Sequence, residues 1–187
     1  NEYCSKNELL VTTDWLSNNL DNPNIRIVDC TMHLRPNADF SSYEALSGQT
    51  DFNSKHIPGS VFIDPEKELS QKHPKLRFAL PPPDSFAKIL GKYGISNSSR
   101  IIAYSSGDPH WATRFWWLLK IFGHREAAVL DGGLQKWIFE KKPVSSRPNY
   151  TIKSCVYESS PLNRDCVATM DEVEDNLDND NICLVNA

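Results

Sequence analysis

Apolar positions along the chain follow two different spacings. Short unbroken runs rich in β-branched residues are typical of buried strands, whereas apolar residues that recur every three or four positions are typical of helices with one buried face. The unbroken runs predict strands at residues 25–29, within 56–64, at 100–104 and at 127–130. The periodic segments predict helices at residues 12–20, 85–94, 111–122 and 134–142. Because strands and helices alternate, we expect a mainly parallel sheet with helices on both faces.

The segments between these elements are polar and rich in turn-forming residues. Residues 30–55 and 65–83 are expected to be loops. Residues 143–165 carry several prolines among many serines, which predicts either a linker or a strap that wraps around the domain. Asp84 is expected to cap the helix that follows it.

One stretch of the sequence occurs twice. Residues 10–30, LVTTDWLSNNLDNPNIRIVDC, align with residues 167–187, VATMDEVEDNLDNDNICLVNA, at an offset of 157 positions, and nine of the twenty-one pairs are identical. Most other pairs keep an apolar residue opposite an apolar residue. Chance similarity between two Asn- and Asp-rich segments is the alternative, but a tandem duplication explains the match better. We therefore expect a second copy of the domain to begin at the repeat, and this chain to be a fragment that stops inside it.

Composition and charge exclude several classes of function. The net charge is −4 and 40% of the residues are hydrophobic, which is typical of a soluble globular protein and unlike a basic nucleic-acid-binding surface. No apolar run approaches the roughly 18 residues that a membrane-spanning helix requires. The five cysteines include no C-x-x-C pair, so we expect neither a metal site nor a disulfide framework. Free thiols favour a reducing compartment, the cytoplasm or alternatively the mitochondrial matrix.

Spaced motifs along the chain resemble those of the rhodanese-like domains. They are HIPGS at residues 56–60, LPPPDSFAKILGKYGI at 80–95, and ATRFWW, FGH and LDGGLQKW within the segment 103–137. Their order is specific, and the resemblance covers roughly residues 10–142. Together with the repeat, the chain resembles the two-domain sulfurtransferases that use thiosulfate or 3-mercaptopyruvate.

This resemblance implies a five-stranded, mostly parallel sheet flanked by helices, an α/β fold present twice. It implies a first, non-catalytic rhodanese-like domain at residues 8–142, a linker at 143–166 and the truncated start of a second domain at 167–187. In the family only the second domain is catalytic. A cysteine there, directly after the strand equivalent to residues 100–104, accepts a sulfur atom as a persulfide and passes it to a thiol or to cyanide. Backbone N–H groups at a helix N-terminus stabilise such a thiolate and its persulfide.

The turn SSGDP after the strand at 100–104 occupies the position of that cysteine. Ser105 stands in its place, and a serine hydroxyl is neither acidic nor soft enough to carry a transferable sulfur atom. We therefore expect no catalytic residue in this chain, and we interpret Ser105, Ser106, Gly107 and Asp108 as a vestigial active-site loop in which Asp108 caps the next helix. A serine hydrolase is disfavoured, because the turn lacks G-x-S-x-G and no histidine follows a later strand.

Four further side chains near this turn have more than one interpretation. By the resemblance, Met32, His110 and Trp111 form part of a wall that faces the catalytic loop of the second domain, with an ordinary domain interface as the alternative. Arg114 is expected to pair with a carboxylate or to extend along the surface, with substrate binding as the alternative. A fifth residue, His56, is expected to fix its own turn by hydrogen bonds.

These observations predict the non-catalytic domain of a two-domain sulfurtransferase. The parent protein would move sulfane sulfur from thiosulfate or 3-mercaptopyruvate to a thiophilic acceptor through a Cys persulfide in the second domain, on which the first domain packs. The competing hypothesis is an inactive rhodanese-fold module that binds or regulates. We expect no cofactor, no metal, and neither nucleic acid nor membrane as a partner.

Overall fold

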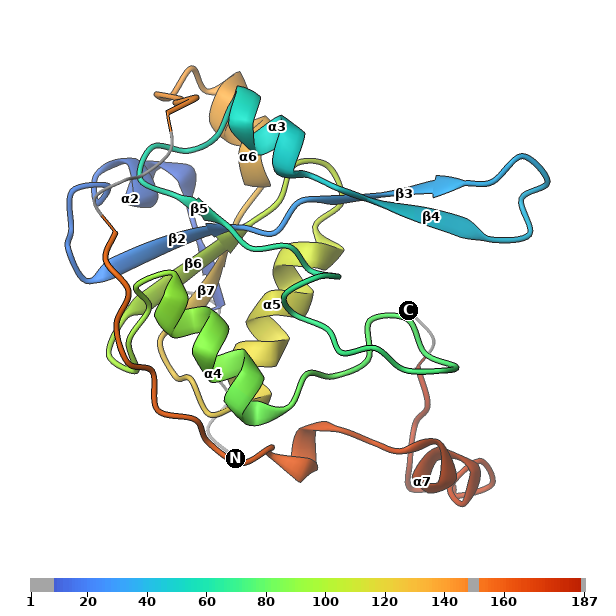
Figure 1. Ribbon diagram of the computed structural model, residues 1–187. Helices are drawn as coiled ribbons and strands as arrows, with labels where there is room; N and C mark the ends of the chain where they lie inside the picture. The colour runs from blue at the N-terminus through green and yellow to red at the C-terminus, as the bar shows by residue number, and fades with distance from the viewer. Residues whose placement is uncertain (1–8, 148–151, 186–187) are drawn as a thin grey trace.

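The computed structural model describes residues 9–147 and 152–185, and a sheet of five parallel strands lies at its centre (Figure 1). The strands are β1 (Leu10–Val11), β2 (Ile25–Asp29), β5 (Val61–Phe62), β6 (Arg100–Tyr104) and β7 (Ala127–Leu130). Their order across the sheet is β1-β7-β6-β2-β5, and every neighbouring pair is parallel. The four strands expected from the apolar runs are present, and the two-residue strand β1 adds an edge that the pattern did not indicate. The predicted α/β arrangement, a five-stranded parallel sheet flanked by helices, is confirmed.

Helices cover both faces of this sheet, as expected. They are α2 (Thr13–Ser17), α3 (Gln49–Ser54), α4 (Pro83–Lys92), α5 (His110–Ile121) and α6 (Gly133–Phe139). Because side chains alternate along a strand, β6 contributes to two separate cores. Ile101 and Ala103 belong to the core under α4 and α5, while Ile102 and Tyr104 belong to the core under α2 and α6.

The start of α4 differs from the expectation. Pro83 is its first helical residue and Pro82 precedes it, so Asp84 lies inside the first turn and does not cap it. Proline suits the first turn because its φ is preset and its missing N–H is not needed there. The Asp84 carboxylate instead accepts a hydrogen bond from Ser159 Oγ at 2.7 Å. The predicted Asp84 cap is therefore wrong.

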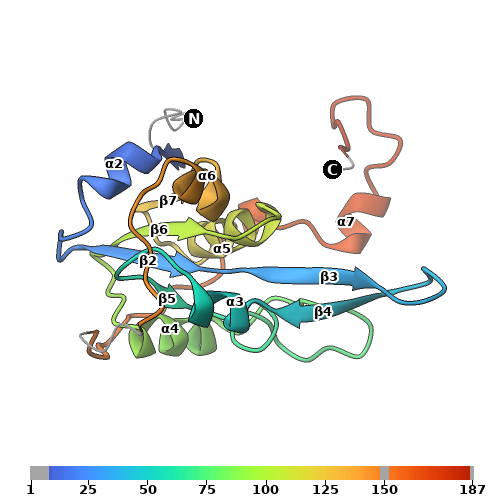
Figure 2. The same ribbon diagram turned by 90° about the horizontal axis from the view of Figure 1, so that it is seen from above.

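Residues 30–55 are not a loop throughout, which corrects a second expectation. They contain strands β3 (Met32–Pro36) and β4 (Tyr43–Ser47), which pair antiparallel, and then helix α3. Both views show this two-stranded arm projecting from the body of the domain (Figures 1 and 2). Most of its side chains are exposed, so it lacks the buried apolar face by which a strand is recognised in a sequence.

Residues 143–147 and 152–163 form a strap that runs across the domain, one of the two possibilities expected for this segment (Figure 1). The backbone N–H of Cys155 donates to the Gly91 carbonyl at 2.9 Å. A Cβ atom at Gly91 would lie 2.4 Å from the carbonyl oxygen of Cys155. Glycine at this position of α4 therefore permits the close approach of the strap.

Two buried histidines fasten this strap. His56 contacts the Phe52 carbonyl through Nδ1 at 2.6 Å and the Arg147 carbonyl through Nε2 at 3.2 Å, so it holds the strap as well as its own turn. The hydroxyl of Tyr157 meets Nδ1 of His124 at 3.0 Å. Burial lowers the pKa of His124, which favours the neutral ring that can accept this hydrogen bond.

The repeated segment adopts the same local structure at both places. Helix α7 (Met170–Glu174), which follows the 3₁₀ turn Arg164–Cys166, corresponds residue for residue to α2, and its N-cap Thr169 corresponds to Thr12, the N-cap of α2. The backbone hydrogen bonds of the first segment recur 157 positions later: those donated by Leu16, Asn18, Asn19, Asn22 and Ile25. Both views show α7 standing apart from the sheet and its helices.

The strand expected after α7 is absent from the described residues. Residues 182–185 correspond to most of β2, yet they form no ladder with any strand in the part of the chain that the structure describes. Ile182, Leu184 and Val185 are exposed, whereas their counterparts in β2 are buried. A strand requires a neighbouring strand to accept and donate its backbone hydrogen bonds, and none lies beside this segment.

Candidate functional site

The turn between β6 and α5 lies at the carboxyl edge of the parallel sheet, where α/β proteins commonly place their sites. Ser105, its first residue, is buried. Its Oγ donates to the Asp108 carbonyl at 2.7 Å, and its own carbonyl accepts the backbone N–H of Leu134 at 3.2 Å. The hydroxyl is therefore directed into the turn and engaged there, so it is not presented to a substrate.

The next residue of the turn is fixed from the neighbouring strand. The backbone N–H of Ser106 donates to Thr31 Oγ1 at 2.8 Å, and the Thr31 hydroxyl in turn donates to the carboxylate of Asp29. Burial raises the pKa of Asp29, although the hydrogen bonds from Thr31 act in the opposite direction. Gly107 completes the bend with φ of +88°, a conformation that glycine adopts without strain.

Asp108 connects the turn to α5. Its Oδ1 accepts the backbone N–H of His110 at 3.0 Å and also contacts Nδ1 of the same ring. Pro109, with φ −71° and ψ −13°, is the residue directly before α5, so Asp108 lies one residue outside the cap position that was predicted for it, and its carboxylate accepts the first backbone N–H of the helix from there. Partial burial works against ionisation, but the hydrogen bonds from His110 hold the pKa of Asp108 below its usual value. The backbone N–H of His110 is therefore already bound to the Asp108 carboxylate, and it is not available to an external anion.

A thiol lies directly beside this turn. The backbone N–H of Cys30 donates to the Tyr104 carbonyl at 2.9 Å, one residue before Ser105. The side chain of Cys30 is fully buried, and burial together with the negative charge of Asp29 raises its pKa well above the usual value. A protonated, buried thiol is a poor nucleophile. Sequence reasoning missed this neighbour because only the pairing of β2 with β6 brings it to the turn.

The three residues predicted to form a wall lie in two different environments. His110 and Trp111, at the start of α5, line an open surface hollow of about 390 Å³. The His110 side chain is 82% exposed, and the ring of Trp111 packs against Phe78 with centroids 5.0 Å apart. Met32 is buried and belongs to the core under α4 and α5, and the largely buried Trp111 belongs to the same core. The structure therefore brings Met32 and Trp111 into one core and leaves His110 exposed on the hollow that Trp111 also lines.

Arg114, on the same hollow, does not form the ion pair that was expected. Its Nη2 donates to the Phe78 carbonyl at 2.6 Å, while its Nε is buried and has no hydrogen-bond partner. Within residues 9–147 and 152–185, no carboxylate pairs with it. The prediction of a carboxylate partner is wrong for the described residues.

A larger hollow, of about 770 Å³, lies in the loop between β5 and α4 and was not identified from the sequence. It is lined by residues 66–67 and 70–78, which include four basic side chains: Lys67, Lys72, Lys75 and Arg77. Arg77 pairs with Glu66 at 2.8 Å and donates to the Tyr43 carbonyl at 2.7 Å, which ties this loop to the arm. The sequence feature that could have indicated this hollow is the cluster of basic residues in a segment that has neither a strand nor a helix pattern.

Two searches of the described residues gave no candidate, one for a metal-ion site and one for a membrane-spanning helix. Residues 9–147 and 152–185 contain no group of three or more His, Cys, Asp or Glu side chains placed to hold a metal ion. Among the described helices, none is both long and apolar enough to cross a membrane.

Comparisons with known proteins agree with this arrangement. A family model for the rhodanese-like domain matches residues 12–140. Thiosulfate sulfurtransferase from Bos taurus is 30% identical over 184 residues, which cover 95% of this chain and 58% of the bovine protein. 3-Mercaptopyruvate sulfurtransferase from Escherichia coli K12 is 36% identical over 128 residues, which cover 68% of this chain and 43% of that protein.

The solved structures give the same result. The 3-mercaptopyruvate sulfotransferase SseA from Escherichia coli superposes with a TM-score of 0.76 at 28% identity, covering 89% of this chain and 60% of that chain. The chain described here thus spans less than two thirds of the length of each of these relatives.

Proposed function

Because this chain belongs to the rhodanese-like domain family, we propose that it is the first, non-catalytic domain of a two-domain sulfurtransferase. In this proposal the parent protein moves sulfane sulfur from thiosulfate or 3-mercaptopyruvate to a thiophilic acceptor. The sulfur travels on a cysteine persulfide that lies outside these 187 residues. The free cysteines of the described chain fit a reducing compartment, the cytoplasm or the mitochondrial matrix.

The observation that carries the proposal is the state of the turn after β6. Sulfur transfer from thiosulfate requires a thiolate to attack the outer sulfur, forming a cysteine persulfide and releasing sulfite with the electron pair of the broken S–S bond. Ser105 offers a hydroxyl that is already bound to the Asp108 carbonyl. Cys30, the thiol beside the turn, is buried and protonated. Neither group can act as the sulfur carrier, which makes this turn a vestigial active-site loop.

The repeat supports the two-domain part of the proposal. The segment after residue 166 is similar in sequence to residues 10–30, and it has the helix position and the backbone hydrogen bonds of α2 and the turn that follows it. Most of its large apolar residues are exposed (Met170, Leu177, Ile182, Leu184 and Val185), as expected for the beginning of a domain whose remaining strands lie elsewhere. We assign residues 8–142 to the first domain, 143–166 to the linker and 167–187 to the start of the second domain.

The proposal also gives roles to the exposed end of α5. If the first domain packs on the second, His110 and Trp111 lie on the hollow that a partner surface would meet. Met32 is buried in the same core as Trp111, so it would not touch a partner surface and would contribute only by packing beneath the wall. The small sulfur donor and the thiol acceptor would then be bound through the second domain.

Thiocyanate formation from thiosulfate and cyanide tests the proposal. We expect no turnover by the 187-residue chain, with bovine thiosulfate sulfurtransferase as the positive control. We expect turnover by the full-length protein, abolished when the cysteine at the turn of the second copy, about 157 positions after Ser105, is changed to serine. Ser105→Ala in the full-length protein serves as the matched control and leaves the rate unchanged. Turnover by the 187-residue chain would contradict the proposal.

The alternative function is a rhodanese-fold module that binds or regulates and has no active copy. The absence of an accessible thiol at the described turn is the observation that favours it. The two functions differ at a single position, because any residue other than cysteine at the turn of the second copy excludes persulfide chemistry there.

A further inference from the structure

Arg114 carries a positive charge that the described protein does not neutralise. Burial lowers the pKa of its guanidinium, which shows that the group has lost part of its water shell. One nitrogen donates to the Phe78 carbonyl, and the buried Nε donates to nothing. A guanidinium offers five N–H donors in a planar fork, and leaving a buried one unpaired costs free energy.

Two other arginines of the chain differ from Arg114, the one arginine of the described residues with a buried nitrogen that has no partner. Arg26 donates to three carbonyl oxygens, those of Gly94, Pro23 and Ile25. Arg77, on the same ring of Phe78 as Arg114, is paired with a carboxylate. Arg114 has one carbonyl and no acid among the described residues. Its Nε is enclosed by the protein, whereas Nη1 has no partner among the described residues and is not buried, so Nη1 is the donor that an external anion can reach.

Arg114 lines the open surface hollow at the start of α5, which we call the α5 hollow. His110, Trp111, Thr113, Arg114 and Trp117 line it, and its volume is about 390 Å³. None of the five is acidic. Trp116 and Trp137 donate their indole N–H groups to carbonyl oxygens, whereas Trp111 and Trp117 donate theirs to no group within residues 9–147 and 152–185.

We propose that the α5 hollow binds a small oxyanion, a carboxylate or a sulfur oxyanion, with Arg114 as its cationic partner and the two indoles as its walls. Arg pairs with such anions through two parallel N–H bonds, and indole N–H groups add donors at the edges. The nearest acid along the chain is Asp108, and its carboxylate is held by His110. The hollow is therefore positive in charge and apolar on its walls, which suits an anion with a small organic or sulfur-containing body.

The assay follows the indole signals of the five tryptophans by ¹H–¹⁵N NMR in the 187-residue chain. Sodium pyruvate and sodium thiosulfate are the two probes, each added at constant ionic strength against sodium chloride. We expect saturable shifts of Trp111 and Trp117, while Trp15, Trp116 and Trp137 serve as internal references. Pyruvamide, which has the same shape as pyruvate without the charge, is the neutral control.

The two probes separate the two possible sources of the anion. Saturation by pyruvate assigns the hollow to carboxylates, and saturation by thiosulfate assigns it to sulfur oxyanions; either supports the proposal. Saturation by neither probe overturns it. Equal shifts with chloride or with pyruvamide overturn it as well, because they would show a general salt effect or an uncharged contact.

Variants of Arg114 test the assigned cation. Arg114→Gln is expected to weaken binding by about tenfold or more, while Arg125→Gln, an exposed arginine just beyond α5, changes it by less than about twofold. If Arg114→Gln does not fold, Arg114→Lys keeps the positive charge and loses the fork, and we expect it to weaken binding by about threefold or more. Unchanged affinity in the folded variant would overturn the proposal. The measurement involves no turnover, so its result is independent of the sulfurtransferase proposal.

Discussion

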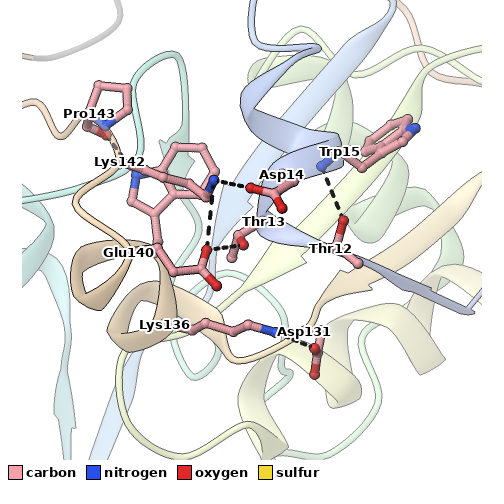
Figure 3. A network of polar contacts seen from close by, with 10 residues as sticks. Thr12, Thr13, Asp14, Trp15, Asp131, Lys136, Glu140, Lys142 and Pro143 are labelled. Carbon is pink, nitrogen blue, oxygen red and sulfur yellow. Dashed lines mark hydrogen bonds and ion pairs between the residues drawn. The ribbon is translucent and has the colours of Figure 1, made fainter.

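Replacing Thr13 by valine tests the contact that joins the first and last helices of the domain. Figure 3 shows the Thr13 hydroxyl of α2 directed at the Glu140 carboxylate, just after α6, with Lys142 beside both acids. Lys142 Nζ lies 2.5 Å from Asp14 Oδ1 and 3.7 Å from Glu140 Oε2. The Thr13 hydroxyl is the buried member of this network, because the residue is 1% exposed.

The expected loss of stability follows from the burial of the two partners. Valine has nearly the shape of threonine, so Thr13→Val removes the hydrogen bond and little packing. A hydrogen bond to a charged acceptor contributes about 1.5–3 kcal/mol. The Glu140 side chain keeps 31% of its surface exposed, so water can replace part of the lost contact and the lower value, about 1.5 kcal/mol, applies. For a domain of this size, Tm falls by about 3–6 °C.

Urea unfolding followed by tryptophan fluorescence measures this loss, and Thr113→Val is the matched control. Thr113 is exposed and its hydroxyl contacts only carbonyl oxygens at the start of its own helix, so the control changes stability by less than about 0.5 kcal/mol. A double-mutant cycle with Glu140→Ala should give a coupling energy of about 1 kcal/mol. If Thr13→Val costs no more than Thr113→Val, or if the two changes in the cycle add, the reasoning is refuted.

Three further predictions concern the strap and the buried side chains. Gly91→Ala displaces the strap at Cys155, so amides of residues 152–158 should exchange with solvent faster than in the wild type; unchanged exchange would contradict the close contact. Burial lowers the pKa of His124 from its ordinary value of 6.5, so below about pH 6.5 the unfolded chain binds more protons than the folded chain. The stability that the neutral His124 ring contributes is therefore fully present above that pH and is lost as the pH falls. The free energy of unfolding of His124→Gln, measured with urea, should accordingly depend less on pH than that of the wild type. Cys30, being buried and protonated, should react with iodoacetamide far more slowly than Cys155, as measured by peptide mass spectrometry; equal labelling would contradict its burial.

The positions of the main strands followed from local sequence because each is a short apolar run with both faces covered. In β6, all residues except Arg100 are buried, and an unbroken run such as RIIAY has few other stable environments. The motifs around the turn likewise placed Ser105 at the family's cysteine position. The arm formed by β3 and β4 was missed for the opposite reason: exposed strands leave no apolar alternation to read.

The chemistry of the turn depended on contacts between distant segments. Asp108 and His110 are close in the sequence, so a contact of the Asp108 carboxylate with the start of α5 could be expected from local sequence. The position of Cys30 beside Ser105 was not, because it arises from the pairing of two strands separated by some seventy residues. Its inert state follows from complete burial next to Asp29, which no local pattern reports.

By itself the sequence determined the α/β class, the family motifs, the serine at the position of the sulfur-carrying cysteine, and the repeat of the first helix. These are local properties of composition, spacing and similarity. Only the tertiary structure decided which of the conspicuous side chains have partners. Arg114 was expected to pair with a carboxylate or to extend along the surface. The fold places its guanidinium over the Phe78 ring, where it donates to the Phe78 carbonyl and forms no ion pair with a described residue. Whether a charge is neutralised depends on which surfaces the packed helices bring together, and that is a property of the whole fold.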